Sequence, residues 1–475
     1  MTDGPVGATT DPRVDEVARL LAPWLHAQRW FAGKNRPVDG VAVLAATVLK
    51  EAGPRVWHLV VDVDQAGTHT VYQVPVSLRD EHMDRLEHVL IGEVDGLAVY
   101  DALHDKDATA ELARRIAEED GSDLLDFHHE PGADVPVDAP SLVLTGEQSN
   151  TSLVYGDIAL LKVFRRVAPG TNPDVEIHDA LTRAGCTQVA PLLGWVDGRW
   201  TDPTTGRMQE ASLAMLQAFL VTATDGWRLA TTSVRDLYAE GDLHADEVGG
   251  DFAGESRRLG VATAEVHRVM AEVLPTGELH GDALRAMASA MRGRLEDALE
   301  IVPELRPHAR ALHAAYEDVA ALPGPVPVQR VHGDYHLGQV VRTVLGWKLL
   351  DFEGEPEKPL AERVQLDSPV RDVAGMLRSF DYAARHLLVA DHPGSDQIAY
   401  RAAEWAERNR EAFCDGYAAS AGWDPRDQRA LLRAYETDKV VYEAVYEARN
   451  RPAWLPIPLA AMERLAPAST PEELP

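Results

Sequence analysis

The sequence is poor in cysteine and has no long apolar run. Its 475 residues include two cysteines, Cys186 and Cys414, far apart along the chain. A disulfide framework or a cysteine-ligated zinc site would need more thiols, so we expect a reducing, cytoplasmic location. The longest apolar stretch, residues 213–223, is far shorter than a membrane span, and the N-terminal segment lacks signal or transit character. We therefore expect no membrane partner.

Basic residues are also scarce. The chain has 46 lysines and arginines against 76 aspartates and glutamates, a net charge of −30. Binding to a nucleic-acid backbone requires clustered basic side chains that displace counterions, so we expect no nucleic-acid partner. The hydrophobic fraction of 45% and the charged fraction of 26% are typical of globular proteins. A chain of this length exceeds one compact core, which predicts two or three domains.

The order of strand-like and helical patterns predicts three parts. Strand-like runs occur over 41–77 and 141–167, and long amphipathic helices dominate after about residue 223. Short strands and turns interrupt these helices over 326–352. The predicted helices are 255–272, 280–301, 306–321, 400–419 and 427–449. We predict an α+β protein with an N-terminal α/β cap over 1–90, a β-rich lobe over 91–222 and a helical lobe over 223–475.

Lys162 lies in the apolar stretch ALLKVF, which reads as a strand. An isolated strand lysine is commonly an edge residue that discourages aggregation. Fourteen residues later, Glu176 lies on a predicted helix over 172–185, from which it can reach back to the sheet. A lysine held by a glutamate in this order directs a cation at nucleotide phosphates in kinase-like folds.

The turn TGEQSNTS, residues 145–152, has neither the GxGxxG pattern nor a Walker loop. It offers backbone N–H groups and hydroxyls, which can wrap anionic oxygens. A solvated hairpin turn is the alternative interpretation. The polar members of this turn that we consider are Thr145, Ser149, Asn150, Thr151 and Ser152, of which Ser149, Asn150 and Thr151 are the candidate nucleotide contacts.

The stretch VHGDYHLGQV is followed closely by WKLLDFEGEP. Asp334 lies in a His-Gly-Asp turn, and the amide of Gln339 comes five residues later. Asp351 directly follows a predicted strand, and Glu353 is two residues further on. Phosphoryl transfer needs one carboxylate that accepts the hydroxyl proton and further oxygen ligands that hold Mg²⁺ against the phosphates. A solvated turn is the alternative for Asp351 and Glu353.

The two histidines of this stretch, His332 and His336, are expected to make structural hydrogen bonds. Two histidines four positions apart could form half of a zinc site, but no third histidine or cysteine stands nearby at ligand spacing. We therefore predict magnesium chemistry rather than zinc chemistry.

These motifs occur in the order of a kinase-like fold: polar turn, Lys, Glu, HGDxHxxQ, DFE. VHGDYHLGQV and LLDFEGEP resemble the catalytic and metal-binding loops of aminoglycoside phosphotransferases and choline kinases. Those relatives usually carry Asn in place of Gln339, and Glu353 stands where protein kinases have the glycine of DFG. The resemblance implies a bilobal kinase-like fold that acts on a small molecule, not on protein.

Further blocks are similar to actinobacterial maltokinases, including LHAQRWFAGKNRPV (25–38), LQAFLVTATDGW (216–227) and YETDKVVYEAVYEARNRPAWLPIPL (435–459). This resemblance implies ATP- and Mg²⁺-dependent phosphorylation of maltose at its anomeric hydroxyl, giving maltose 1-phosphate for α-glucan and glycogen synthesis. It also implies an N-terminal cap and a trehalose synthase-type partner, and we expect a monomer.

The resemblance assigns roles to matching residues. Asp334 would be the catalytic base; Gln339, Asp351 and Glu353 would ligate Mg²⁺; Lys162, oriented by Glu176, would bind phosphates; Gln217 and Phe219 would lie beside the adenine.

The acceptor site is expected on the predicted helix 427–449. Tyr435, Lys439, Tyr442 and Tyr446 fall on one helix face, at spacings of four, three and four. An aromatic stripe is more often core, but phenol hydroxyls and a lysine amine suit a sugar. The resemblance to maltokinases implies that Lys439, Tyr442 and Tyr446 contact the disaccharide.

Two other motifs have structural interpretations. Arg371 and Asp372 begin a predicted helix and are expected to brace the catalytic loop, since an acidic side chain is favourable at a helix N-terminus. Trp30 and Phe31 are expected in the core of the cap.

Two other functions remain open. One is a kinase of another small sugar or an aminosugar, which acidic residues around the acceptor would favour. The other is an inactive binding or scaffolding module. The presence of Lys162, Asp334, Gln339 and Asp351 argues against the second, because degenerate kinases usually lose at least one of them.

Overall fold

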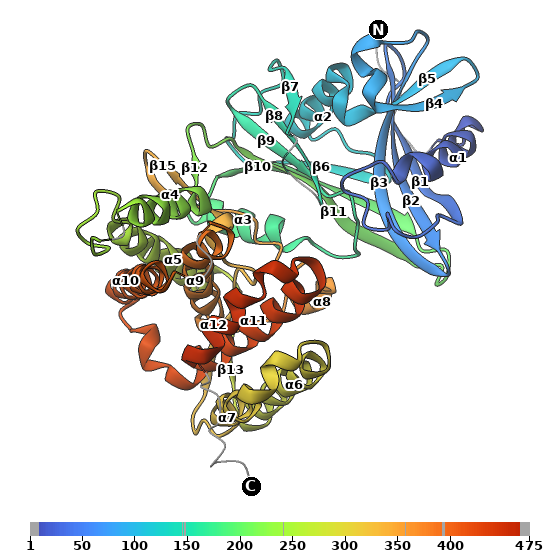
Figure 1. The fold of residues 1–475 in the computed structure, drawn as a ribbon. Coiled ribbons are helices and arrows are strands. Elements are labelled where there is room, and N and C mark those ends of the chain that lie inside the picture. The colour runs from blue at the N-terminus through green and yellow to red at the C-terminus, as the bar shows by residue number, and fades with distance from the viewer. Residues whose placement is uncertain are drawn as a thin grey trace. The chain divides into compact units, whose positions relative to one another are not determined.

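The structure is a computed structural model that describes residues 9–144, 146, 149–240, 242–356, 358–391 and 395–465. The chain divides into two compact units (Figure 1). The first comprises Met1–Asp179 and Ala190–Val221, and the second comprises Ala180–Val189 and Thr222–Pro475. Every helix in the described ranges is too short or too polar to cross a bilayer.

The first unit begins with a five-stranded antiparallel sheet in the order β1-β2-β3-β5-β4. Helix α1 (Arg13–Leu25) packs its apolar face against this sheet. Trp30 and Phe31 are buried in the same core, which confirms their predicted place. The strands are β1 (Gly40–Lys50), β2 (Arg55–Gln65), β3 (Thr68–Arg79), β4 (Leu90–Val94) and β5 (Leu97–Asp101).

A six-stranded antiparallel sheet follows in the order β6-β10-β11-β9-β8-β7. Helix α2 (Lys106–Glu118) buries Leu112 and Ile116 in the core of this sheet. The strand hairpin predicted over 141–167 is confirmed as β7, β8 and β9. The strands are β6 (Leu125–His129), β7 (Ser141–Val143), β8 (Thr151–Tyr155), β9 (Ala159–Val163), β10 (Leu192–Thr201) and β11 (Met208–Ala218).

Strand β3 joins the two sheets through Gln73. Its backbone N–H donates to the carbonyl of Arg165 (2.9 Å), and its side-chain amide donates to the carbonyls of Phe164 (2.9 Å) and Leu213 (2.5 Å). The amide oxygen of Gln73 lies 2.9 Å from Nε2 of His58. Burial lowers the pKa of His58 to about 4, although Gln73 opposes the shift, so the seam between the sheets holds a neutral imidazole.

Arg165 is the buried charge at this seam and is fully excluded from solvent. Its guanidinium pairs with Asp101 at the end of β5 (2.5 Å) and donates from Nε to the hydroxyl of Thr151 (2.8 Å). The ring of Trp30 lies 4.7 Å from the guanidinium carbon, within cation–π distance. One arginine thus connects the N-terminal sheet to the first residue of β8.

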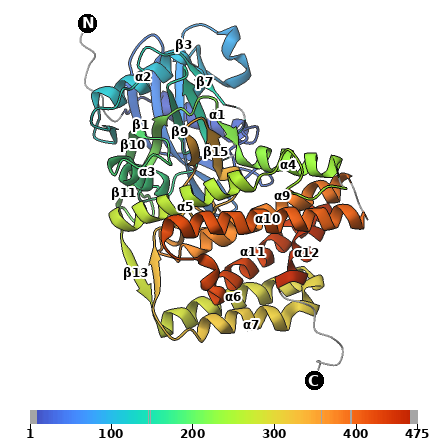
Figure 2. The ribbon, with the colours of Figure 1, turned by 90° about the vertical axis from the view of Figure 1, so that its left-hand side faces the viewer.

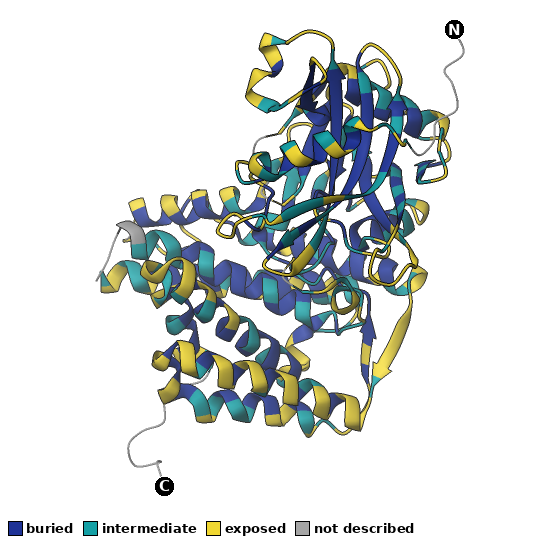
Figure 3. Cartoon of the chain, turned by 90° about the vertical axis from the view of Figure 1, so that its right-hand side faces the viewer, coloured by how far each residue is buried: buried dark blue, intermediate teal, exposed yellow. Residues whose placement is uncertain are grey.

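The second unit is mainly helical. The helices predicted from sequence are confirmed as α5, α6, α7, α10 and α11, whereas α4 was not predicted. Figure 2 shows α5 and α10 running side by side, and Figure 3 shows the buried stripes of the helices facing inward. The helices are α4 (Gly226–Ala239), α5 (Ala253–Val273), α6 (Gly281–Ile301), α7 (Ala309–Ala320), α8 (Leu360–Arg363), α9 (Val370–Asp391), α10 (Asp396–Ala421), α11 (Arg429–Asn450) and α12 (Pro456–Leu465).

Two glycines explain the close packing of α5 on α10. A Cβ atom at Gly260 would lie 2.1 Å from the carbonyl oxygen of Phe413, and one at Gly416 would lie 1.9 Å from that of Arg257. Any side chain at these positions would force the helices apart.

Short strands interrupt the helices where the sequence predicts them, over 326–352. These strands, β14, β15 and β16, pair with two earlier short strands: β15 and β16 form a three-stranded sheet in the order β12-β15-β16, and β14 pairs with β13. The loops that connect these strands hold the predicted catalytic motif. The strands are β12 (Thr224–Asp225), β13 (Thr276–Leu279), β14 (Val326–Gln329), β15 (Val340–Thr343) and β16 (Gly346–Leu349).

We predict that Asp101→Asn destabilises the first unit by about 3 kcal/mol, because the variant leaves the charge of Arg165 buried without a counter-ion. Urea denaturation followed by tryptophan fluorescence measures the change. The matched control is Asp126→Asn, which breaks a pair with Arg199 in which both side chains are about one-third exposed. It should cost at most about 1 kcal/mol. Equal losses in the two variants would contradict a special role for the Arg165 pair.

Candidate active site

Asp372, in the first turn of α9, holds the backbone of the His-Gly-Asp turn. Its carboxylate accepts hydrogen bonds from the N–H groups of His332 (2.8 Å) and Gly333 (2.9 Å), and His267 hydrogen-bonds to it at 2.9 Å. Burial would raise the pKa of Asp372, but these partners lower it below its ordinary value. The predicted brace is confirmed, and it also accounts for Gly333, whose φ of 85° disfavours any side chain.

Arg371 supports the same turn through the carbonyl of Gly333, whereas Asp372 binds its N–H groups. Its guanidinium donates to the carbonyl of Gly333 (3.1 Å) and pairs with Glu355 (3.2 Å) and Asp367 (3.1 Å). Glu355, in the GEPEKP segment, was missed by sequence reasoning, because an exposed-looking acidic turn gives no signal of its partner. The turn is therefore fixed by both a carboxylate and a guanidinium.

The two histidines of the motif are structural, as predicted. Nε2 of His332 lies 2.8 Å from the carbonyl oxygen of Leu350, and Nδ1 of His336 accepts the N–H of Gly338 (3.0 Å). Burial lowers the pKa of His336. In a neutral imidazole, the lone pair on Nδ1 of His336 is available to accept the hydrogen bond from Gly338.

Asp334 faces a lysine that lies 105 residues later in the chain. Nζ of Lys439, on α11, is 3.2 Å from the Asp334 carboxylate. Burial would raise the pKa of Asp334, but the cation of Lys439 and the nearby His336 outweigh it and lower the pKa to about 2. Burial lowers the pKa of Lys439, and Asp334 and Glu355 more than restore it. Asp334 is therefore an ionised carboxylate at neutral pH and can accept a proton.

The predicted metal ligands lie together at the end of β16. The amide of Gln339 donates to the Asp351 carboxylate (3.1 Å), and carboxylate oxygens of Asp351 and Glu353 lie within 4.8 Å of one another. Asp351 adopts a φ of 63°, in the left-handed region that a non-glycine residue enters only at a cost. Such strain is found disproportionately at functional sites.

The residues fit a magnesium ion. The ion prefers oxygen ligands, and carboxylate oxygens and an amide oxygen are available here. The Gln339 amide, which now points its nitrogen at Asp351, would present its oxygen after a rotation of the amide plane. Glu353 is held by Arg363, which donates to its carbonyl at 3.2 Å and lies 3.9 Å from its carboxylate. When bound, Mg²⁺ would neutralise phosphate charge.

In the first unit, Lys162 pairs with Asp174 at 2.9 Å. Sequence reasoning named Glu176 as the partner and did not foresee Asp174; the role of Glu176 toward Lys162 stays a prediction. Asn172 accepts the N–H of Asp174 (2.9 Å) and so sets the start of α3 (Pro173–Arg183). Burial would raise the pKa of Asp174, but Lys162 and His178 hold it far below its ordinary value.

The polar turn before β8 is described only in part. Thr145, named as a hydroxyl of this turn, lies outside the described residues, as do Glu147 and Gln148. Ser149 and Asn150 form a bend, and Thr151 is buried, with its hydroxyl accepting the bond from Arg165. Thr151 thus anchors the turn through its side chain, while Ser149 and Asn150 remain candidate nucleotide contacts.

The predicted adenine segment lies at the end of β11. The N–H of Phe219 donates to the carbonyl of Ile158 (2.8 Å), and Gln217 pairs with Leu160 in the β9–β11 register. The Gln217 amide oxygen is buried and lacks a hydrogen-bond partner among the residues that the structure describes. A buried acceptor without a donor fits a ligand with an N–H group.

Helix α11 places Lys439, Tyr442 and Tyr446 on one face, as predicted. Nζ of Lys439 lies 5.1 Å from the centre of the Tyr442 ring. The rings of Tyr442 and Tyr446 lie 6.3 Å apart with an angle of 25° between their planes, and each side chain is about 40% exposed. We call these three side chains, Lys439, Tyr442 and Tyr446, the phenol ribbon; its Lys439 end lies beside Asp334.

Tyr435 does not belong to this ribbon. It is buried, and its hydroxyl donates to Asp367, so its predicted place on the polar face is wrong. Arg451 and Trp454, which sequence reasoning missed, extend the ribbon instead. The Arg451 guanidinium lies 5.3 Å from the Tyr446 ring and 4.4 Å from the Trp454 ring. Both follow the end of α11, where no helical periodicity indicates their position.

The second unit thus combines an ionised carboxylate, a lysine cation and a group of oxygen donors around two adjacent loops. Phosphoryl transfer depends mainly on positioning and charge neutralisation, with a carboxylate that accepts the hydroxyl proton. The arrangement offers a carboxylate and oxygen donors of the kinds that this reaction needs, and aromatic rings of the phenol ribbon are suited to the C–H faces of a sugar.

Two family comparisons match this chain. Residues 24–105 match the maltokinase N-terminal cap domain, and residues 158–427 match the phosphotransferase enzyme family. The cap match includes the five-stranded sheet, and the second match includes Lys162 and the catalytic loops.

Curated relatives and solved structures agree with these matches. A glucosamine kinase of Streptacidiphilus jiangxiensis is 31% identical over 381 residues, 76% of this chain and 82% of that protein. A glucosamine kinase of Mycolicibacterium smegmatis (strain ATCC 700084 / mc(2)155) is 28% identical, over 69% of this chain and 80% of that protein. The structure of a glucosamine kinase in complex with glucosamine, ADP and inorganic phosphate superposes with a TM-score of 0.69 at 24% identity, covering 94% of this chain and 98% of that one.

We predict that Asp334→Asn lowers kcat by about 10²–10⁴-fold, because the amide cannot accept the proton. Nucleotide affinity, measured by titration calorimetry, should stay within about threefold, a free-energy change below about 1 kcal/mol. The matched control is Asp438→Asn. Asp438 lies next to Lys439 on α11 and pairs with Arg294 of α6, so this variant should keep wild-type kcat. Activity that survives in Asp334→Asn would contradict the assignment of the base.

A second prediction concerns pH. In Lys439→Met, burial of Asp334 is no longer opposed by the lysine cation, so the pKa of the carboxylate rises. A carboxylate with a raised pKa is protonated, and inactive as a base, at higher pH. The acidic limb of kcat, measured at saturating acceptor, should therefore move to higher pH by about one unit or more.

Lys439→Arg, which keeps the positive charge, controls for this pH shift and should leave the acidic limb unchanged. An acidic limb in Lys439→Met that coincides with that of Lys439→Arg would show that the cation does not set the protonation of Asp334.

Proposed function

The chain belongs to the phosphotransferase enzyme family, and we propose that it transfers the γ-phosphoryl group of ATP to the anomeric hydroxyl of maltose. The sugar oxygen forms a bond to the γ-phosphorus, the bond from that phosphorus to the β-phosphate oxygen breaks, and the hydroxyl proton passes to Asp334. The products are maltose 1-phosphate and ADP.

The matches confirm the predicted relationship to aminoglycoside phosphotransferase-type kinases and the predicted α+β kinase-like fold with an N-terminal cap. The chain is a phosphotransferase that acts on a sugar or aminosugar. ATP is the phosphoryl donor, and Mg²⁺ would be held by Gln339 and Asp351, with Glu353 as the further ligand. Lys162, fixed by Asp174, would bind the nucleotide phosphates.

The position of Lys439 supports a neutral acceptor. Its ammonium group is 3.2 Å from the Asp334 carboxylate, so the acceptor hydroxyl must approach the base beside a fixed positive charge. A protonated aminosugar would bring a second cation to the same place, and like charges in a partly buried site repel. A neutral sugar has no such cost and can accept a hydrogen bond from the lysine.

The length of the phenol ribbon supports a disaccharide. Lys439 and Tyr446 are seven residues apart on α11, which corresponds to about 10 Å along the helix axis. This length exceeds one sugar ring. A monosaccharide at the base would contact Lys439 and Tyr442 and leave Tyr446 uncovered, whereas a second glucose unit would lie over it.

An aminosugar kinase is the second candidate, and two observations favour it. The curated relatives at 31% and 28% identity are glucosamine kinases. Glu355, held by Arg371 and Lys358, is an acidic group in the electrostatic environment of Lys439. A monomeric state and a trehalose synthase-type partner, which the family resemblance implied, stay predictions.

We predict that the purified protein, given ATP and Mg²⁺, releases ADP rapidly with maltose and slowly with glucosamine, glucose or maltotriose. The physical reason is the lysine beside the base together with the two-ring length of the ribbon. ADP release measures the acceptor preference, and NMR of the product identifies the phosphorylated hydroxyl as the anomeric one.

Tyr446→Ala separates the two candidates, because it removes only the outer part of the ribbon. It should raise KM for maltose and leave KM for glucosamine unchanged. Rapid ADP release with glucosamine and none with maltose would replace the proposed function with the second candidate.

A further inference from the structure

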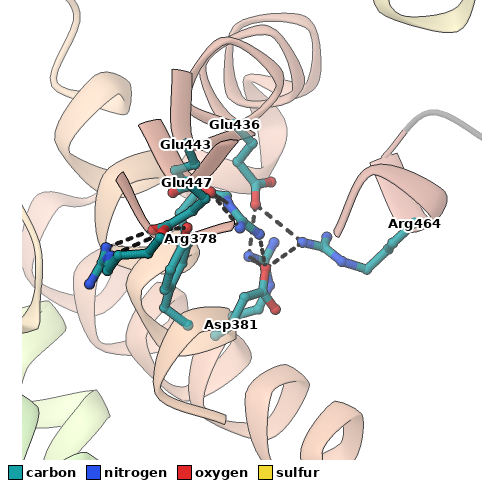
Figure 4. Close-up of polar contacts among 9 residues, drawn as sticks. Arg378, Asp381, Glu436, Glu443, Glu447 and Arg464 are labelled. Carbon is teal, nitrogen blue, oxygen red and sulfur yellow. Dashed lines mark hydrogen bonds and ion pairs between the residues drawn. The ribbon is translucent and has the colours of Figure 1, made fainter. Parts of the chain in front are cut away.

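A cluster of charged side chains, most of them buried, joins four helices of the second unit (Figure 4). Each carboxylate in it contacts at least one arginine. Helices α9, α10, α11 and α12 all contribute, so the cluster fixes how these helices pack. Its members are Arg378 and Asp381 from α9, Arg410 from α10, Glu436, Glu443 and Glu447 from α11, Arg464 from α12, and Arg451.

Arg378 contacts two carboxylates of this cluster, Glu443 and Asp381. Its Nε and one terminal nitrogen donate to a single oxygen of Glu443 (3.1 and 2.7 Å), and its other nitrogen pairs with Asp381 (2.6 Å). The Arg378 side chain is 1% exposed and the Glu443 side chain 10%. Buried charges of this kind persist only when they are paired and hydrogen-bonded.

Glu443 is also a neighbour of Lys439. The two residues are four apart on α11, so their side chains lie on the same face, one turn from each other. A lysine and a glutamate at this spacing can form an ion pair. Lys439 pairs with Asp334 instead, although Glu443 also attracts its charge. The difference between the two carboxylates is that Glu443 already has the guanidinium of Arg378.

We propose that Arg378 is a positioning residue for phosphoryl transfer, which neutralises Glu443 and thereby keeps Lys439 on Asp334. The proposal rests on the proposed function only in taking Asp334 as the base. Burial raises the pKa of Glu443 even beside Arg378, and the charges of Arg378 and Lys439 oppose the shift. Without Arg378, Lys439 would be the nearest cation left to compensate Glu443, and the carboxylate would draw the ammonium group away from Asp334. Asp334 would then lose the cation that keeps it ionised and oriented.

Helix α9, which carries Arg378, also holds the catalytic loop. Asp372, which binds the backbone of His332 and Gly333, precedes Arg378 by six residues on α9, about 9 Å along the axis. Helix α9 therefore fixes the loop that contains Asp334 at one point and the helix that contains Lys439 at the other. The two halves of the base–lysine pair are aligned by a single rigid element.

The test compares Arg378→Gln with Arg410→Gln. Each variant removes one buried guanidinium from the same cluster, but Arg410 pairs with Glu436 (2.7 Å) and with Asp381 (3.5 Å) and does not contact Glu443 among the described residues. We expect both variants to lower the melting temperature. Only Arg378→Gln should lower kcat, by about tenfold or more, an effect of about 1.4 kcal/mol on the barrier. KM for ATP should change by less than about threefold.

The double variant Arg378→Gln with Glu443→Gln decides whether the effect passes through Glu443. Removal of the competing carboxylate should return Lys439 to Asp334 and bring kcat back to within about threefold of wild type, a strongly non-additive result. Arg378→Lys, which keeps the charge, serves if Arg378→Gln does not fold. Arg378→Lys should show less than half of the tenfold loss of kcat, and adding Glu443→Gln to it should not improve kcat.

Equal kcat in Arg378→Gln and Arg410→Gln, or a double variant no faster than Arg378→Gln, would overturn the proposal. All variants are assayed with whichever sugar gives the fastest ADP release by the wild-type protein. Lack of activity on maltose would therefore refute the acceptor assignment, while the comparison among the variants would still decide the role of Arg378.

Discussion

The ion pair between Asp334 and Lys439 is the interaction on which the site depends. A carboxylate in a partly buried loop would tend to take up a proton, and a protonated group cannot act as a base. The lysine that keeps it ionised comes from α11, 105 residues away. Three features fix the distance between these two side chains: the His-Gly-Asp turn, the start of α9 and the charged cluster that includes residues of α11.

The N-terminal cap is built into the nucleotide lobe rather than appended to it. Gln73 hydrogen-bonds to backbone on both sides of the seam, and Arg165 joins Asp101 and Trp30 to Thr151 at the first residue of β8. Contacts from the cap therefore hold Thr151, the residue that directly follows the polar turn.

Features set by local sequence were predictable, and those set by distant contacts were not. The His-Gly-Asp turn, the spacing of Lys439, Tyr442 and Tyr446, and Asp372 at a helix start all follow from short-range patterns. The pairing of Lys162 with Asp174 does not. It depends on where Asn172 begins the helix and on how α3 lies against β9, and the sequence indicates only the first. The prediction for Tyr435 was wrong for the same reason, because its hydroxyl hydrogen-bonds to the distant Asp367 in the core.

The lysine beside the base also links catalysis to specificity. Lowering the pKa of Asp334 to about 2 makes the carboxylate a weaker base, which would be a poor choice for a reaction limited by proton transfer. Phosphoryl transfer depends mostly on positioning and charge stabilisation, so orientation of the hydroxyl matters more than basicity. Under the proposed function, a fixed cation is then tolerable at the base, and it disfavours a cationic acceptor by electrostatic repulsion.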